Sequence, residues 1–294
     1  MNKYHFDSVK HAHYLNDKPL MGCSTIVNII AKPLQWWVAE QTLKPLGWQK
    51  YNKKIDGKYK IVPDKIRLPD VDRMRLAISE MRPKVFLELL DSCYTAHNNR
   101  KEEAGEKGTE RHATLEKYVK HCMKEHDGKP YKDLNETIQV FIDWAQVHIK
   151  RFLWSEVHTY SKELWTGGVA DVGWEDLQGR VVAGDFKSSK DVFFSQFLQV
   201  AGYDTMLSES GGYDADGNKT FTLKRPIEAY CVAPFGQDEF DPIIMDYVEE
   251  FRSAFKSCTH IHKLNELFKK VKQSRPIKPA EEPKTGTLAE LLAV

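Results

Sequence analysis

Three charged side chains, Asp171, Asp185 and Lys187, interrupt two runs of small and β-branched residues at 167–172 and 181–187. Turn-forming residues separate the runs, which predicts an antiparallel hairpin in which Asp171 pairs opposite Gly184 or Asp185, so that the two carboxylates lie close together. Asp185 and Lys187 share one face because side chains alternate along a strand. Adjacent carboxylates repel unless a cation lies between them, and hard oxygen ligands suit Mg²⁺ or Mn²⁺. Lys187 would then orient a water or stabilise charge that develops on a phosphate.

Further polar residues lie in the elements expected around this hairpin. His112 and Glu116 are four residues apart in a helical pattern, so they share a face on which a neutral imidazole can bind a metal. Gln199 and Tyr203 are one turn apart in a later helix and can reach back over the strand end. Taken alone, such a histidine is more often a surface residue. Glu156, on the strand before the hairpin, is more often solvent-facing than part of a site.

The segment 44–67 is a candidate nucleic-acid surface. It holds eight basic residues against two acidic ones, with aromatic residues between them. Cations can meet phosphates and rings can stack on bases, so Trp48, Lys53 and Lys54 are candidate DNA contacts. The alternative is an exposed hairpin insertion whose aromatic residues pack inward, because a charge run is often only solvated.

The overall composition excludes several classes of protein. Lys and Arg number 43 against 42 Asp and Glu, so the net charge of +1 gives no support for nucleic-acid binding. The five cysteines are scattered without metal-site spacing, which argues against a zinc or iron-sulfur site and fits a reducing compartment. The sequence contains no signal core and no apolar run of about 20 residues, so we expect a cytoplasmic protein without a membrane segment.

Helices and strands that would position these residues follow from the apolar periodicity. Ser24 is expected to cap a short first helix, and Pro33 to start a second. The last helix should bury Phe251, Phe255, Leu264 and Phe268. Further helices are expected at 70–97 (broken at Pro83), 108–121, 133–151 and 193–207, and strands at 155–161 and 226–233.

From about residue 106 the order is helix, helix, three strands, helix, strand, with acids on the second and third strands. The motifs are Gly108 with His112, Gly168 with Asp171, the triplet 185–187, and residues 199–203. This arrangement resembles the core of the PD-(D/E)XK nuclease superfamily, and within it the RecB-type exonuclease branch that includes mitochondrial genome maintenance exonucleases and many phage nucleases. The resemblance implies a restriction-endonuclease-like α/β fold with a central mixed sheet flanked by helices.

The resemblance also implies roles for individual residues. His112, Asp171, Asp185 and the Phe186 carbonyl would bind Mg²⁺ or Mn²⁺, and Lys187 would be the catalytic lysine. Gln199 and Tyr203 would hold the substrate or the lysine in place. Many relatives carry Glu where this chain has Asp185, so activity is expected to survive with a slightly shifted metal. The cysteines that bind a cluster in some relatives are missing, so no iron-sulfur cluster is expected.

These expectations divide the chain into three parts. Residues 1–105 should form a largely helical region with the basic insertion 44–67, and residues 106–272 the nuclease core. Residues 273–294 should be a flexible tail that either frays or docks on a protein partner. The expected function is a metal-dependent DNA exonuclease of phage or bacterial recombination, repair or degradation. A structure-specific endonuclease on the same fold and a non-catalytic DNA-binding or assembly module are the alternatives.

Overall fold

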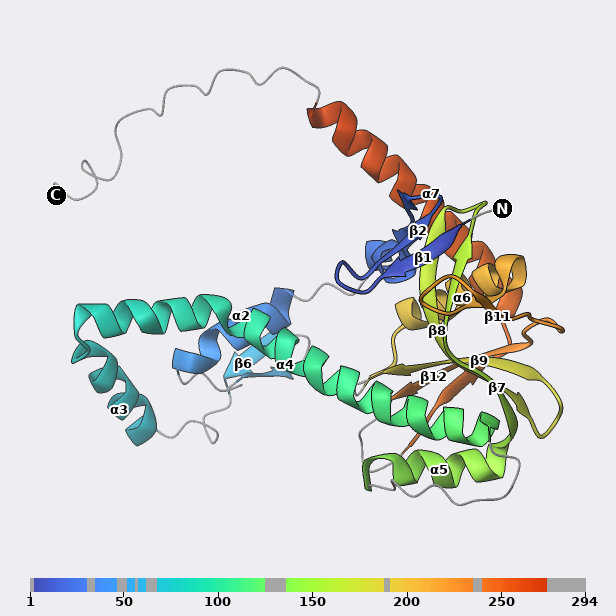
Figure 1. The fold of residues 1–294 in the computed structure, drawn as a ribbon. Helices are drawn as coiled ribbons and strands as arrows, with labels where there is room; N and C mark the ends of the chain where they lie inside the picture. The colour runs from blue at the N-terminus through green and yellow to red at the C-terminus, as the bar shows by residue number, and fades with distance from the viewer. Residues whose placement is uncertain are drawn as a thin grey trace.

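The computed structural model describes residues 3–30, 35–46, 52–55, 58–61, 68–124, 136–187, 191–234 and 240–273. These residues form an α/β fold on an eight-stranded mixed sheet with helices on both faces (Figure 1), which confirms the expected fold at this level. The strands lie in the order β11-β10-β7-β8-β9-β12-β13, and β4 pairs with the free part of β8. Their bounds are Met21–Gly22 (β4), Ile149–Ser161 (β7), Thr166–Asp176 (β8), Val181–Lys187 (β9), Gly212–Tyr213 (β10), Lys219–Phe221 (β11), Ala229–Pro234 (β12) and Ile243–Met245 (β13).

The sheet changes from antiparallel to parallel at its centre. Strand β8 pairs antiparallel with β7 on one side and with β9 on the other, the latter as expected for the hairpin. Strand β12 lies parallel to β9, and parallel strands need a long crossover. Helix α6 (Phe194–Ser210) lies within that crossover. It packs on the sheet and on helix α7 (Val248–Gln273).

Two apolar layers cover the two faces of the sheet. Along β12, Tyr230 and Val232 join the cluster that includes α6 and α7, whereas Ala229 and Cys231 join the opposite cluster. This alternation follows from the side-chain period of a strand. The opposite cluster contains the last turns of helix α4 (Pro83–Lys124) and the helix α5 (Glu136–His148). Both faces of the central strands are therefore buried.

Helix α4 differs from the sequence prediction. Two helices, at about 70–97 and 108–121, were expected, but α3 (Leu68–Ser79) ends before Pro83 and one helix of 42 residues then runs to Lys124. Pro83 is the first residue of α4, where its missing N–H costs nothing. Gly105 and Gly108 cost about 1 kcal/mol each in a helix interior, and they do not end this one. The helix thus crosses the domain boundary expected at residue 105.

Two other helix predictions need correction. The helix expected at 133–151 ends earlier, because Ile149 is the first residue of β7. Its apolar face, formed by Ile138, Phe141, Ile142 and Ala145, is buried in α5. In α7, Phe251 and Phe255 are buried, whereas Leu264 is 52% and Phe268 65% exposed. The second half of α7 extends beyond the sheet (Figure 1), so the sheet does not cover these two side chains.

The amino-terminal residues form a small sheet beside the large one. Strands β1 (Tyr4–Asp7), β2 (Ala12–Leu15) and β3 (Lys18–Pro19) make it, with Asn16 and Asp17 at the expected turn. Helix α1 (Cys23–Val27) and the 3₁₀ turn η1 (Asn28–Ile30) follow. Ser24 is not the cap that was expected: Gly22 occupies the N-cap position, without a side-chain cap hydrogen bond. Ser24 is already inside the helix.

A helical arm extends from the sheet (Figure 1). It contains α2 (Gln35–Leu43), the 3₁₀ turn η2 (Lys44–Leu46), α3 and the first half of α4, and α2 and η2 pack on α4. In the basic segment, β5 (Asn52–Ile55) pairs with β6 (Lys58–Ile61) as a hairpin. Trp48, Pro33 and the side chains of Lys53 and Lys54 lie outside the described residues.

Within the described residues, no helix is both long and apolar enough to cross a membrane. The tail expected from residue 273 lies, after that residue, outside the described part of the chain.

Candidate metal centre

The two carboxylates of the hairpin lie where strands β8 and β9 separate. Val172 pairs with Gly184, which is the last pair of the ladder at this end, and one step further the register sets Asp171 opposite Asp185. Beyond that point the N–H of Phe186 donates to Asp171 Oδ2 at 3.0 Å instead of to a backbone carbonyl. β4 takes over the edge of β8 only at Thr166 and Gly167. Asp171 therefore lies in the part of β8 between the segment that pairs with β9 and the segment that pairs with β4.

Strand β7 adds a third carboxylate. Ser155 pairs with Val172 and Val157 with Ala170, so Glu156 stands opposite Asp171. The φ angle of Glu156 is +48°, a left-handed conformation that side-chain-bearing residues rarely adopt. Such strain costs on the order of 1–3 kcal/mol and persists only where the surroundings impose it, often at functional sites. Here the Glu156 carboxylate lies beside His112 and Asp171.

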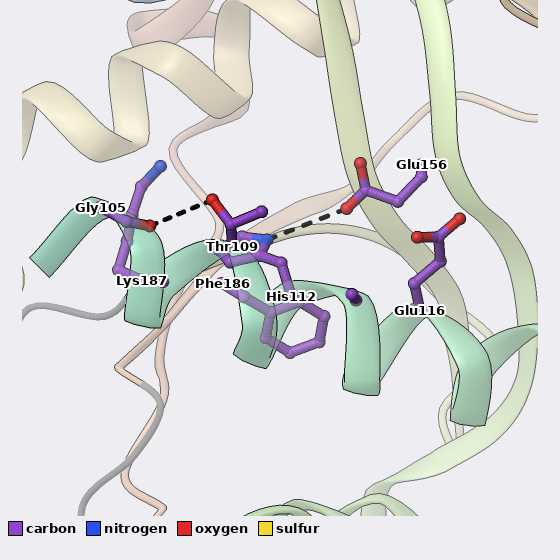
Figure 2. Close-up of a pocket in the computed structure, with 9 residues that line it drawn as sticks. Gly105, Thr109, His112, Glu116, Glu156, Phe186 and Lys187 are labelled. Carbon is purple, nitrogen blue, oxygen red and sulfur yellow. Dashed lines mark hydrogen bonds and ion pairs between the residues drawn. The ribbon is translucent and has the colours of Figure 1, made fainter. Parts of the chain in front are cut away.

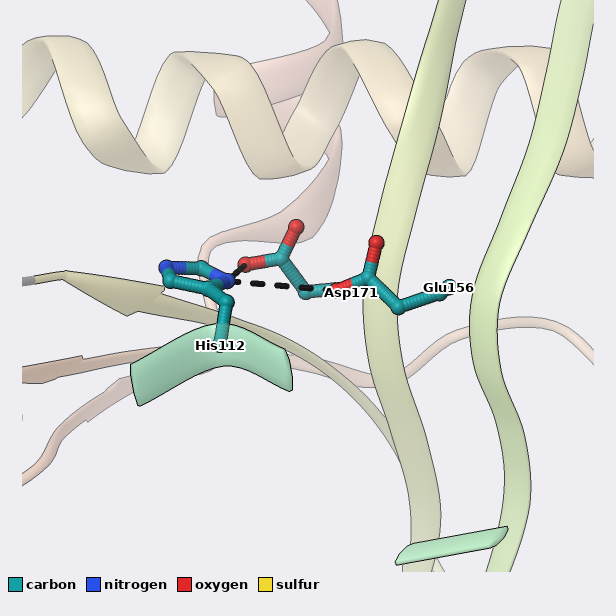
Figure 3. A group of neighbouring side chains, drawn as sticks. All are labelled: His112, Glu156 and Asp171. Atoms are coloured by element: carbon teal, nitrogen blue, oxygen red, sulfur yellow. Dashed lines mark ion pairs between the residues drawn. The ribbon is translucent and has the colours of Figure 1, made fainter. Parts of the chain in front are cut away.

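Helix α4 brings the imidazole to the carboxylates. His112 Nδ1 lies 3.6 Å from Asp171 Oδ2 and 3.9 Å from Glu156 Oε1. One ligand atom from each of these three residues falls within 4.8 Å of the other two (Figure 3). Glu156, which the sequence favoured as solvent-facing, is thus part of the cluster. The signal that would have found it is its position opposite Asp171 in the register, which propensity alone does not give.

Asp185 and Lys187 form the second half of the site. Lys187 Nζ lies 2.6 Å from Asp185 Oδ2 and donates to Gln199 Oε1 at 3.1 Å. Gln199 Nε2 in turn donates to the hydroxyl of Tyr203. The side-chain amide of Gln199, fixed in this way on α6, thus holds the lysine in place. A Cβ on Gly168 would lie 2.8 Å from the Tyr203 ring, which explains a glycine there. These four polar residues are brought together as expected.

The Asp185 carboxylate is buried without satisfied hydrogen bonds. Its side chain is 0% exposed, and neither oxygen has a hydrogen-bond partner among the described residues, although the Lys187 ammonium lies close by. Burial raises the pKa of Asp185 to about 7, against the lowering effect of Lys187. Lys187 offsets part of the cost of burying this carboxylate, but Asp185 Oδ1 has no partner among the described residues, which is costly. A cation beside it would remove that cost.

Neighbouring charges set the protonation of the other groups. Burial raises the pKa of Asp171, and the Glu156 charge raises it further. Burial alone would lower the pKa of His112, but Glu156 and Asp171 outweigh it and raise the pKa. Burial likewise opposes the Lys187 ammonium, but Asp185 and Asp171 raise its pKa, so the lysine stays charged.

His112, Glu156 and Lys187 face an open cleft of about 490 Å³ (Figure 2), whereas Asp171 and Asp185 are buried and do not line it. One face of α4 lines it with Gly105, Gly108, Thr109, His112 and Glu116, and Glu156, Phe186 and Lys187 complete it. A Cβ on Gly105 would meet nothing within 4 Å, so the helix is open to a ligand on this side. Glu116 pairs with Lys120 rather than with the cluster. Phe186, expected to offer its carbonyl, gives Asp171 its N–H and sets its ring 6.3 Å from that of His112.

The donor set fits a hard divalent cation. His112, Glu156 and Asp171 offer one nitrogen and carboxylate oxygens, and Asp185 adds an oxygen that lacks a donor within the described part of the chain. Mg²⁺ and Mn²⁺ prefer oxygen ligands, and an imidazole is acceptable to Mn²⁺ in particular. The free cysteines Cys23, Cys93, Cys122, Cys231 and Cys258 do not join any candidate metal group within the described residues.

Replacing Glu156 by glutamine is expected to weaken Mn²⁺ binding at least about tenfold. Loss of a group that only orients a metal ligand costs 10- to 100-fold in affinity, and a direct ligand should cost no less. Calorimetric titration of the variant with Mn²⁺ measures the effect. Glu116→Gln is the matched control, because Glu116 lines the same cleft but pairs with Lys120. Equal affinities for the two variants would remove Glu156 from the ligand set.

Metal affinity should rise with pH and level off above neutrality. The bound state needs a charged Asp185, whose pKa is about 7, and a neutral His112, whose pKa is raised. Below these pKa values a metal must displace protons, so affinity should fall by about tenfold per pH unit for each proton displaced. Titrations with Mn²⁺ from about pH 5.5 to about pH 8.5 test this. A flat profile would mean that neither group binds the metal.

Neither a family model nor a curated protein matches the chain. What the site does therefore has to be argued from its geometry.

Proposed function

We propose that this chain is a metal-dependent DNA exonuclease of the RecB-type branch of the PD-(D/E)XK superfamily, with a restriction-endonuclease-like core. The observation that carries the proposal is the convergence of His112, Glu156 and Asp171 beside the Asp185/Lys187 pair, at an open cleft that His112, Glu156 and Lys187 line. Glu156 comes from β7, Asp171 from β8 and Asp185 from β9, three neighbouring strands. The order of elements, with α4 and α5 before these strands and α6 and β12 after them, supports the family assignment.

In this proposal the side chains divide the work on a phosphodiester. His112, Glu156, Asp171 and Asp185 would hold Mg²⁺ or Mn²⁺, which supplies Lewis-acid stabilisation of phosphoryl charge and lowers the pKa of water. The Lys187 ammonium, held by Gln199, points its charge at the cleft, where it stabilises negative charge that develops on a phosphoryl oxygen. Because Asp185 and Gln199 fix the lysine before substrate binds, little reorganisation is needed during the reaction.

The linked polar side chains around Asp185 favour an enzyme over a binding module. A structural role would not need a lysine, an amide and a phenol linked in series next to a fully buried carboxylate that lies 2.6 Å from the lysine. Burying such groups is costly unless a ligand completes their interactions. The proposed role in phage or bacterial DNA recombination, repair or degradation, and the assignment to the cytoplasm, rest on the family resemblance alone.

The test is digestion of end-labelled linear DNA, single and double stranded, beside a covalently closed circle, with Mg²⁺ or with EDTA. Stepwise loss of linear DNA that needs the metal and Lys187 is the expected result. Cutting of the closed circle would instead identify a structure-specific endonuclease. DNA binding without cleavage of any substrate, in Mg²⁺ or Mn²⁺, would contradict the enzyme and favour the binding module.

A further inference from the structure

Two hollows continue from the metal cleft along strand β7. The first hollow, of about 490 Å³, shares Glu156 with the cleft. The second, of about 380 Å³, shares Leu153 and Phe221 with the first. Together they are called the β7 groove. It runs from Glu156 to Arg151, and at 3.3 Å per residue this stretch of strand is about 17 Å long. The groove is therefore an extension of the metal site and not a separate cavity.

The groove exists because the next strand leaves β7 early. β10 pairs with β7 only through Tyr213 and His158. On its other side β10 pairs with β11, and that ladder has a register irregularity between Gly212 and Tyr213. The edge of β7 before Val157 thus has, among the described strands, no partner on that side, and α4 and β11 form the walls.

Positive charge dominates the walls. Five cations line the two hollows: Lys120, Lys124, Arg151, Lys224 and Arg225. Outside the metal cluster they face two carboxylates, Glu175 and Asp214. Hydrogen bonds from Lys150 and Arg151 lower the pKa of Glu175 to about 2, so it is a fixed internal anion.

The remaining cations are available to an anionic ligand. The side chains of Lys120 and Arg225 are 47% and 49% exposed, and each has a surface carboxylate partner, Glu116 and Glu228. Arg225 also lies 3.9 Å from Glu175 and donates to the Gly179 carbonyl. Exposed ion pairs contribute about 0–1 kcal/mol, so phosphates can replace these carboxylates at little cost. Lys124 is exposed one turn beyond Lys120 on α4. A row of phosphates along the groove could therefore form ion pairs with these three cations.

We propose that the β7 groove binds single-stranded DNA that leads to the metal site, with its phosphates on Lys120, Lys124 and Arg225. The proposal rests on the proposed nuclease function and specifies the path of its substrate. Tyr213 and Phe221 line the same groove and are half-buried, because Tyr213 packs on Tyr4 and Tyr160 and Phe221 on Trp154. The exposed part of each ring offers surface to a base. Stacking on aromatic side chains requires unpaired bases, which favours a single strand over a duplex.

The test compares binding of labelled oligonucleotides of about 12 nucleotides in EDTA, where no cleavage occurs, by fluorescence anisotropy. The variant Lys124→Glu/Arg225→Glu is expected to bind single-stranded DNA at least about tenfold more weakly than the wild type. Its slope of log K against log salt should be smaller by about 0.7 for each phosphate that the variant no longer neutralises. Lys256→Glu/Lys263→Glu, on exposed positions of α7, makes the same change of charge and should bind normally. The milder Lys124→Gln/Arg225→Gln, with its melting temperature measured, guards against misfolding.

The outcomes separate this inference from the proposed function. If the wild type degrades DNA and the groove variants bind and degrade a single strand as well as the control does, the β7 groove is not the path. If the groove variants lose duplex binding but keep single-strand binding, the proposed occupant is wrong. If the wild type cleaves nothing while the groove variants lose single-strand binding, the nuclease function fails and the groove stands as a binding site.

Discussion

Replacing Lys187 by alanine is expected to reduce DNA cleavage by about 10²- to 10³-fold, the loss seen when one group that stabilises transition-state charge is removed. The ammonium lies between Asp185 and Gln199, and the Asp185 and Asp171 charges raise its pKa, so it is charged and fixed in place. It is one cation among many near the DNA, so binding in EDTA should change little. Single-turnover cleavage of end-labelled DNA at saturating Mn²⁺ measures the effect.

Two controls show whether the loss is specific to the cleft. Lys256→Ala removes an exposed lysine from α7 and should cleave at the wild-type rate. Gln199→Ala should have a smaller effect than Lys187→Ala, and none in the Lys187→Ala background, because Gln199 acts on the reaction by holding the lysine. Cleavage by Lys187→Ala at the wild-type rate would disprove the role given to Lys187.

The expected pH profile should also respond to this substitution. Lys187 lowers the pKa of Asp185, against the larger effect of burial. Its removal should move the pH range in which Mn²⁺ binding weakens to higher values, as titrations with Mn²⁺ would measure. An unchanged range would mean that the Lys187 charge does not act on Asp185.

The local parts of the site were predictable from the sequence. The hairpin, the closeness of Asp171 and Asp185 and the shared face of Asp185 and Lys187 all follow from a turn and a period of two. Glu156 was not predictable in this way, because its place depends on the register between β7 and β8 and on a left-handed backbone angle. A pattern within one strand carries no information about either.

The errors in the helices have a common physical cause. Amphipathic periodicity predicts which side chains share a face, but not whether another element covers that face. Phe255 of α7 meets α6 and is fully buried, whereas Phe268, on the part of the same helix that passes beyond the sheet, is exposed. In α4 the packing of α2 on one half and the sheet on the other supports the helix on both sides of Gly105.

Replacing Arg252 by methionine is expected to lower the free energy of unfolding by about 3–5 kcal/mol, because removal of one partner leaves a buried charge uncompensated. Arg252 of α7 donates to both oxygens of Asp204 in α6, at 2.6 and 2.9 Å. The Asp204 side chain is 0% exposed, and Tyr230 of β12 donates to it at 2.5 Å. Such a loss is a large part of the free energy of unfolding of a typical domain, which is roughly 5–15 kcal/mol. Urea unfolding should show a lower midpoint at an unchanged slope.

The matched control is Arg100→Met, which breaks an exposed pair with Glu103 and should cost less than about 1 kcal/mol. Asp204→Asn added to Arg252→Met should restore part of the stability, since it removes the buried charge itself. Asp204 lies one residue after Tyr203, so this pair also fixes the helix that holds Lys187 through Gln199. Cleavage by Arg252→Met, measured well below its melting temperature, should therefore fall even where the protein is folded. Equal losses of stability in Arg252→Met and Arg100→Met would show that burial adds nothing to the first pair.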